Sequence, residues 1–266
     1  MTRQVTGFNG TLFARLALLF GWGLVALTTP APVAAQEAPT KELVSNDRLA
    51  TCFDEKTGAF TGPMQVRNEV LVAPDGEHRA YTLNLATGDI RIPSNTPGGW
   101  LAPQCANITR IFVADGRRKD FRLALTILPT EATLLNAAWV VDWSPDSRYL
   151  LFRLLLSQSE SDFGVIDALL YDARSNTFTD PELAYQAFKK RAGRDCVLGS
   201  VLPLGFSSEG KVVLKAGPAY APDNDEPEPN SCLQKSGTWL YDPATGNLTE
   251  CPDNYQIKRF AKFEAQ

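Results

Sequence analysis

The stretch that decides the fold reads Val141-Asp142-Trp143-Ser144-Pro145-Asp146-Ser147-Arg148-Tyr149-Leu150-Leu151-Phe152. It places a Trp-Ser-Pro-Asp turn directly before an alternating apolar strand. Fainter copies of this turn read Ala73-Pro74-Asp75-Gly76 and Phe206-Ser207-Ser208-Glu209-Gly210. Pro presets φ, the Asp side chain caps its own backbone, and Gly tolerates positive φ, so these residue types suit a tight turn. A chain that repeats one strand–turn–strand unit builds a modular β architecture.

A second repeated pattern pairs an aromatic residue with Asp ahead of a hairpin turn. It occurs at Tyr171–Phe178, at Tyr241–Leu248 and, near the start of the chain, at Phe53–Phe60. A weaker relative is Phe112–Gly116. Gly or Asn at the sixth position is the residue type that a turn with positive φ requires. The two patterns alternate along the chain at spacings of about 60 to 70 residues, which predicts repeated antiparallel units.

These Ser-Pro-Asp-Gly-like turns, each followed by a Tyr-Asp-x-x-(Thr/Ser)-Gly hairpin, resemble the blades of WD40-like β-propellers. Propellers of this type occur in the TolB C-terminal domain and in prolyl oligopeptidase. The resemblance covers about residues 50–251. It implies an all-β fold, a β-propeller-like array of antiparallel four-stranded blades, which usually serves as a binding platform.

The repeat departs from that family in its length. Propeller blades usually take about 40 to 45 residues, whereas the period here is longer and only three full units are visible. The alternatives are degenerate blades within residues 94–138, insertions in each unit, or a partial ring completed by a second chain. Because the chain opens with the hairpin pattern, a strand from one terminus could complete a blade begun by the other and cover its edge.

The N-terminus predicts export. Arg3 and Arg15 precede or flank the apolar run Leu16–Leu27, and Val33-Ala34-Ala35 offers small residues to a signal peptidase. We therefore expect a signal peptide over residues 1–35, a flexible lead-in over 36–48 and the β domain over 49–266. The location would be periplasmic or secreted, with no transmembrane segment after signal removal. An uncleaved anchor is the alternative.

Five cysteines, all after residue 51, favour disulfides in an oxidising compartment. Aligning the repeated turns suggests the pairs Cys196–Cys232 and Cys52–Cys105, with Cys251–Cys52 as the alternative for the second. The odd count leaves one thiol over, or pairs it with another chain. Since His78 is the single histidine, we do not expect a Cys/His zinc site.

One insertion between the second and third units is predicted to be helical. Asp180-Pro181-Glu182 supplies an N-cap, a Pro at the first helical position and an acid in the first turn. Leu183, Ala187 and Phe188 form an apolar side, and basic residues precede Gly193.

Candidate chemistry is sparse. His78 lies in a turn and no Gly-x-Ser-x-Gly motif occurs, so no Ser-His-Asp triad and no other catalytic residue is expected. We expect no cofactor. The acidic loop offers weak candidates for a calcium site, namely Asp223, Asp225 and Glu226. The candidates for binding a partner are Trp100, Arg117, Arg118 and Lys119.

The function we predict is an exported, non-enzymatic β-propeller-like protein that binds a protein or peptide partner. The alternative is a carbohydrate-binding protein, or a glycan-processing enzyme that uses carboxylates beside an aromatic residue. A net charge of −4 argues against nucleic acid as a partner. A homo-oligomer that completes the ring is a further expectation.

Overall fold

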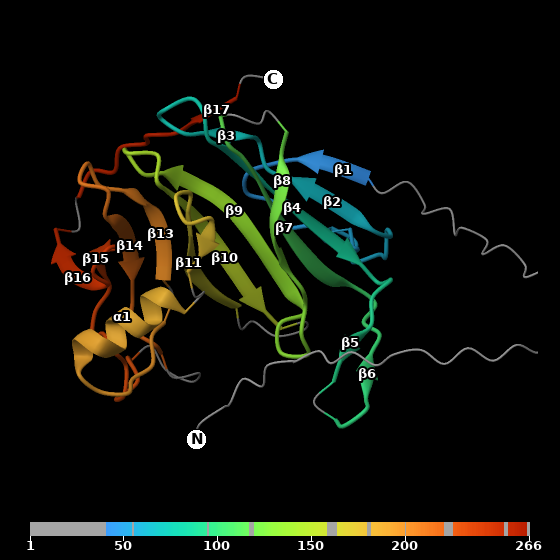
Figure 1. Ribbon diagram of the computed structural model, residues 1–266. Coiled ribbons are helices and arrows are strands. Elements are labelled where there is room, and N and C mark those ends of the chain that lie inside the picture. Colours follow the sequence, from blue (N-terminus) through green and yellow to red (C-terminus); the bar gives the residue numbers. More distant parts are fainter. Residues whose placement is uncertain are drawn as a thin grey trace, which may run out of the picture. The chain divides into compact units, whose positions relative to one another are not determined.

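Three β-sheets follow one another along the chain (Figure 1). The computed structural model describes residues 41–54, 56–94, 96–116, 120–158, 164–179, 182–199, 201–220, 226–252 and 255–264. The first sheet has seven strands, and the second and third have four each. A short hairpin and one helix complete the described elements. The prediction of a mainly β fold with antiparallel four-stranded sheets and one short helix is confirmed at this level.

The first sheet is built around β4. Its strands are β1 (Lys41–Val44), β2 (Met64–Arg67), β3 (Leu71–Val72), β4 (Arg79–Thr87), β7 (Ala106–Ala114), β8 (Arg122–Ile127) and β17 (Lys262–Phe263). One side of β4 pairs with β7, which pairs with β8. Its other side pairs with β2 and β3 in turn, and β1 and β17 pair with these two strands. The two ends of the described chain therefore complete the same edge of this sheet.

The strand β1 lies near the start of the described chain. Residues 41–44 fall within the predicted lead-in over 36–48 and form a strand parallel to β2. The reason is burial, because Leu43 packs against a small core cluster that contains Cys52 and Cys105.

The second and third sheets have the four-stranded antiparallel pattern that the repeat predicts. The second contains β9 (Leu135–Trp143), β10 (Tyr149–Ser157), β11 (Gly164–Asp172) and β12 (Thr177–Phe178). The third contains β13 (Val201–Phe206), β14 (Val212–Ala216), β15 (Gly237–Asp242) and β16 (Asn247–Cys251). In both sheets the strands pair in chain order.

The repeated turns occupy equivalent places in all three sheets. They connect β3 to β4, β9 to β10 and β13 to β14. In each, the amide of the fourth residue donates to the carbonyl of the first: Gly76 to Ala73, Ser147 to Ser144 and Gly210 to Ser207, at 2.9, 2.9 and 3.0 Å. The three donors have φ angles of 72°, 58° and 78°. Their interpretation as tight turns is confirmed.

The aromatic-Asp patterns are also hairpin turns. Asn176 and Gly246 donate their amides to Asp172 and Asp242, each at 2.8 Å, and link the third and fourth strands of the second and third sheets. Gly58 and Asp54 form the same bond at 2.8 Å. That hairpin lies between β1 and β2 of the first sheet and is closed by an isolated bridge from Phe53 to Phe60.

Polar side chains of β4 and of the segment between β2 and β3 satisfy the open edge of β9. The Ala138 carbonyl accepts from the Thr82 hydroxyl at 2.7 Å, and the Ala138 amide donates to Oδ1 of Asn84 at 3.1 Å. The Val140 amide donates to Oδ1 of Asn68 at 3.3 Å. An unpaired strand edge would leave buried backbone groups without partners. Here side chains take the place of a neighbouring strand.

A buried carboxylate holds the C-terminal segment against β9. Oδ1 of Asp142 accepts the amides of Trp143 and Ala261, each at 2.9 Å, and the Phe260 amide lies 3.3 Å from both oxygens. Asp142 is fully buried. From there the segment continues to β17, while Lys258 forms a bridge to Phe206 of the third sheet. The C-terminal segment thus contacts all three sheets.

The inserted helix, α1, spans Leu183–Ala192, and Gly193 ends it in the left-handed region with φ of 64°. Ala184, Ala187 and Phe188 are buried against the second and third sheets. The predicted helix is confirmed, but its start differs from the prediction: Glu182 is the N-cap and the first turn holds no acidic residue. Asp180 and Pro181 lie outside the described residues. Within the described parts of the chain, no helix is long and apolar enough to cross a membrane.

Both proposed disulfides are confirmed. They join Cys52 to Cys105 and Cys196 to Cys232. The alternative pair of Cys251 with Cys52 is therefore wrong.

Candidate functional site

A cavity lies beside the first disulfide, where two segments joined by that bond meet a third. Cys52 ends the segment that leads into the Phe53–Phe60 hairpin, and Cys105 directly precedes β7. The loop before Cys105 follows the hairpin of β5 (Ile92–Pro93) and β6 (Trp100–Leu101). This loop passes very close to Gly88, where a Cβ would lie 2.6 Å from the Gln104 carbonyl oxygen. A larger residue than glycine would displace this wall of the cavity.

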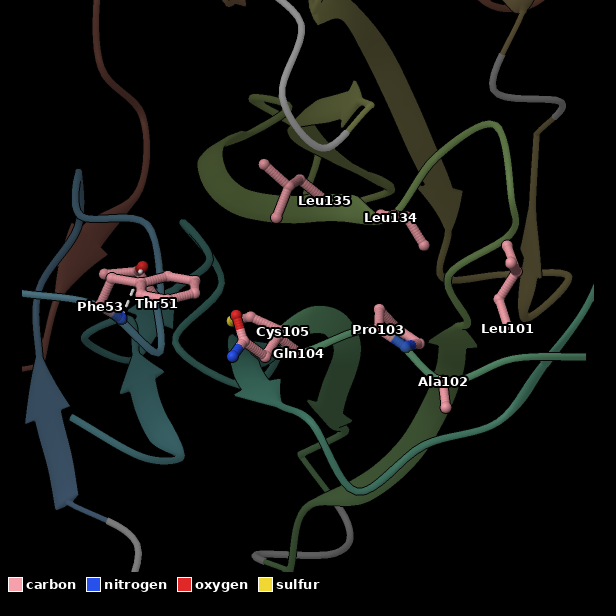
Figure 2. A pocket seen from close by; sticks show the side chains of 9 residues that line it. All are labelled: Thr51, Phe53, Leu101, Ala102, Pro103, Gln104, Cys105, Leu134 and Leu135. Carbon is pink, nitrogen blue, oxygen red and sulfur yellow. Dashed lines mark hydrogen bonds between the residues drawn. The ribbon is translucent and has the colours of Figure 1, made fainter. Parts of the chain in front are cut away.

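The cavity has a volume of about 580 Å³. Figure 2 shows Phe53 with Thr51 on one side, Leu134 and Leu135 on another, and residues 101–105 along the third. Its lining carries no ionisable side chain, because Cys105 is part of the disulfide. The volume falls within the range of about 300–1,000 Å³ that is usual for ligand sites, and such sites are mostly apolar. Its chemistry suits the burial of uncharged, apolar groups.

Exposed aromatic side chains flank this cavity along the chain. Phe60 is 54% exposed and packs edge-on against Phe53, with ring centroids 5.7 Å apart. Trp100 is 64% exposed and directly precedes the lining residue Leu101. Trp100 therefore has the exposure that a binding residue needs. By contrast, Trp143 and Trp239 are core residues, as the repeat predicts.

Sequence reasoning missed most of this lining. Phe53 belongs to a repeated hairpin pattern, so the sequence predicts a structural role for it rather than a binding role. Leu134 and Leu135 carry no motif, and they meet residues 101–105 only in the folded chain. Two sequence signals point to this place: the predicted pairing of Cys52 with Cys105, and Trp100, which directly precedes the lining residue Leu101.

The other candidate residues do not assemble into a site that the structure describes. Arg117, Arg118 and Lys119 lie outside the described residues, as do Asp223 and Asp225. Glu226 is described and exposed. Among the described residues there is no group of three or more His, Cys, Asp or Glu side chains that could hold a metal ion.

The single histidine has a local partner. Nδ1 of His78 lies 2.6 Å from Oδ2 of Asp75 within the first repeated turn. Burial alone would raise the pKa of Asp75, but hydrogen bonds from the His78 side chain and from the amides of Glu77 and His78 lower it. The same carboxylate therefore caps its own turn, which is the turn-residue interpretation of the repeat.

A second, polar cleft of about 260 Å³ forms between the turns of the second and third sheets. It brings together Asp146, Glu209 and Asp242 beside Tyr149. Two of these carboxylates have partners within the protein. Asp146 accepts a hydrogen bond from the amide of Arg148 at 3.2 Å, and Glu209 forms an ion pair with Lys211 at 2.8 Å.

The pKa of Asp242 is also lowered. Burial would raise it, but hydrogen bonds from the amide of Ala244 and from Thr245 outweigh that effect. A carboxylate pair for glycoside hydrolysis needs one acid whose pKa is raised, so that it is protonated at neutral pH. The cleft contains the carboxylates that such a reaction needs. The lowered pKa of Asp242, however, is opposite to the raised pKa required of the acid.

Comparison with known proteins adds no assignment. No protein-family model matches the sequence, and no curated protein matches it at a significant level. The resemblance to WD40-like β-propellers thus rests on the repeated turns and hairpins alone.

Proposed function

We propose that this chain is an exported, non-enzymatic protein that binds a protein or peptide partner through the cavity lined by residues 101–105. The observation that carries the proposal is an uncharged cavity of about 580 Å³ with Trp100 and Phe60 exposed beside it. Aromatic side chains that remain exposed offer large contact area at low entropic cost, and they are enriched at protein interfaces.

Export to an oxidising compartment is part of the proposal. Two disulfides support it, because such bonds persist mainly in secreted and periplasmic proteins. We also propose that the sheets are related to propeller blades. Equivalent turns between the first two strands of the second and third sheets, and equivalent hairpins between their last two strands, support that relation.

The test is capture of a partner from the native envelope or secreted fraction by the immobilised protein. Ala102 is exposed and lines the cavity, so Ala102→Glu introduces a charge there without removing a core side chain. Ser175 is exposed in the hairpin between β11 and β12, away from both clefts, so Ser175→Glu is a control that adds the same charge. We expect the wild type and Ser175→Glu to recover the same partner, and Ala102→Glu and Trp100→Ala to lose it. Equal recovery by all variants, or no partner with the wild type, would refute the proposal.

A glycan array separates the rival function. Binding of a glycan that is abolished by Asp242→Asn and not by Ala102→Glu would place the activity in the polar cleft instead. A blank array together with protein capture supports the partner-binding function.

A further inference from the structure

The outer face of the first sheet is unusually apolar. In an antiparallel sheet, residues directly opposite each other share a face and alternate residues point to opposite faces. Thr82 and Asn84 of β4 are fully buried, so the residues between and beside them point outward. The apolar residues on this outer face, taken from the strand register, are Tyr81, Leu83, Leu85, Ile108, Phe112 and Leu123.

Water-facing sheet faces normally carry polar side chains in alternation with buried apolar ones. Here the outward positions of β4 from Tyr81 to Leu85 are aromatic or aliphatic, and Leu123 of β8 is 52% exposed. Val44 of β1, which lies opposite Arg67, is 38% exposed. A contiguous apolar patch of this kind on a protein surface commonly marks an interaction site.

Aromatic rings and arginines organise the patch. The Tyr81 ring stacks on Phe112 with centroids 4.8 Å apart and meets Phe121 edge-on at 4.8 Å. The Arg67 guanidinium lies 5.6 Å from the centre of the Tyr81 ring, and the Arg79 guanidinium lies 5.6 Å from that of Phe121. Aromatic and arginine side chains are the residue types most enriched in the energetic centres of protein interfaces.

The charges of this face are unbalanced. Arg67 pairs with Glu42 at 3.3 Å and Arg79 with Glu264 at 3.6 Å. Arg110 lies opposite Leu83 on one side and Thr126 on the other, which places it within the apolar patch. No carboxylate of the described residues forms an ion pair with Arg110. A guanidinium in such surroundings binds a carboxylate with two parallel hydrogen bonds when one is supplied.

We propose that the outer face of the first sheet docks a protein segment that carries apolar side chains together with a carboxylate for Arg110. The argument is charge complementarity: the patch is locally positive, whereas the chain as a whole has a net charge of −4. A broadly anionic membrane or nucleic acid would be repelled by the rest of the chain. A short acidic segment contacts the patch alone, so the negative charge of the rest of the chain does not repel it. This surface is separate from the cavity of the proposed function and does not depend on it.

The experiment selects ligands from a displayed library of random twelve-residue peptides with the full-length protein as bait. Selected peptides are then synthesised and titrated by fluorescence anisotropy against the wild type, Arg110→Glu and Arg174→Glu. Arg174 is exposed in the hairpin between β11 and β12, so its reversal is a matched control for net charge. Circular dichroism checks that each variant is folded.

We expect enriched peptides to combine apolar residues with Asp or Glu. Arg110→Glu should weaken their binding by about tenfold or more, the loss of one charge-assisted contact, and Arg174→Glu should leave it unchanged. Peptides with Lys in place of the acid should bind Arg110→Glu better than the wild type. Ala102→Glu should have no effect, which separates this surface from the cavity.

Several results would overturn the proposal. They are failure to enrich any peptide, enrichment of peptides without acids, and equal affinity of the wild type and Arg110→Glu. Binding to phosphatidylserine vesicles that requires Arg110, in the absence of peptide binding, would assign the patch to a membrane surface instead.

Discussion

Replacing Asp142 tests how the C-terminal segment is held to the three sheets. Asp142→Ala removes the acceptor of two 2.9 Å hydrogen bonds from the amides of Trp143 and Ala261. A hydrogen bond to a charged group contributes about 1.5–3 kcal/mol, so two of them set an upper limit of about 6 kcal/mol. Burial of the carboxylate offsets part of this, because burial is the largest influence on Asp142 and raises its pKa. We therefore expect the free energy of unfolding to fall by about 3 kcal/mol.

Asp142→Asn is the informative companion variant. The two short bonds both end on Oδ1, whereas Oδ2 accepts the longer 3.3 Å bond from the Phe260 amide. An asparagine whose carbonyl oxygen takes the place of Oδ1 keeps both short bonds. It should lose about 1 kcal/mol or less.

The assay is urea unfolding followed by circular dichroism, with hydrogen exchange of residues 255–264 as a local readout. Asp142→Ala should expose the amides of this segment to rapid exchange, and Asp142→Asn should protect them. A loss of less than about 1 kcal/mol in Asp142→Ala would refute the anchoring role. Equal losses in the two variants would show that the charge, rather than the Oδ1 acceptor, is what matters.

Three further predictions concern pH, the first disulfide and the helix. Because the pKa of Asp142 is raised above its unfolded value of 3.8, the folded state holds this proton to higher pH. Its contribution to stability should fall as the pH rises above that value, so in urea unfolding the wild type should lose stability relative to Asp142→Asn as the pH is raised. Replacing Cys52 and Cys105 together by serine should cost about 2–4 kcal/mol in urea unfolding and should abolish partner capture, since this bond joins two walls of the cavity; unchanged capture would show that the walls hold without it. Phe188→Ala should cost about 3–5 kcal/mol, because this buried ring packs edge-on against Trp239 at 5.1 Å; a smaller thermal shift than an exposed-site alanine gives would place the helix outside the core.

The proposals separate two surfaces with different chemistry. The cavity is uncharged and lies at the disulfide that joins Cys52 to Cys105. The outer sheet face combines aromatic rings with arginines. An uncharged site selects by shape and apolar burial, whereas Arg110 adds a requirement for a carboxylate. Comparing Ala102→Glu with Arg110→Glu distinguishes one partner from two. If one partner contacts both surfaces, each variant weakens its binding. If there are two partners, each variant weakens the binding of one of them.

The amino-acid sequence by itself determined the local structure of this protein. The turn at Ser144–Ser147 and the hairpin at Asp242–Gly246 form where the sequence predicts them, because their hydrogen bonds close within a few residues. The helix Leu183–Ala192 ends at its glycine for the same local reason. The two disulfides followed from aligning repeated units, which places equivalent cysteines at equivalent positions.

The tertiary structure alone decided how the sheets meet and where a partner could bind. The pairing of β1 and β17 with one edge of the first sheet joins the two ends of the described chain. The hairpin pattern near the start of the chain suggested such a closing strand, but the strands that pair are set only by the fold. The support of β9 by Asn84 and the burial of Asp142 involve residues that look like ordinary strand and turn positions. The cavity likewise needs Phe53, Leu135 and residues 101–105 at one place. Such contacts depend on burial and on partners many residues away, so they exist only once the chain has folded.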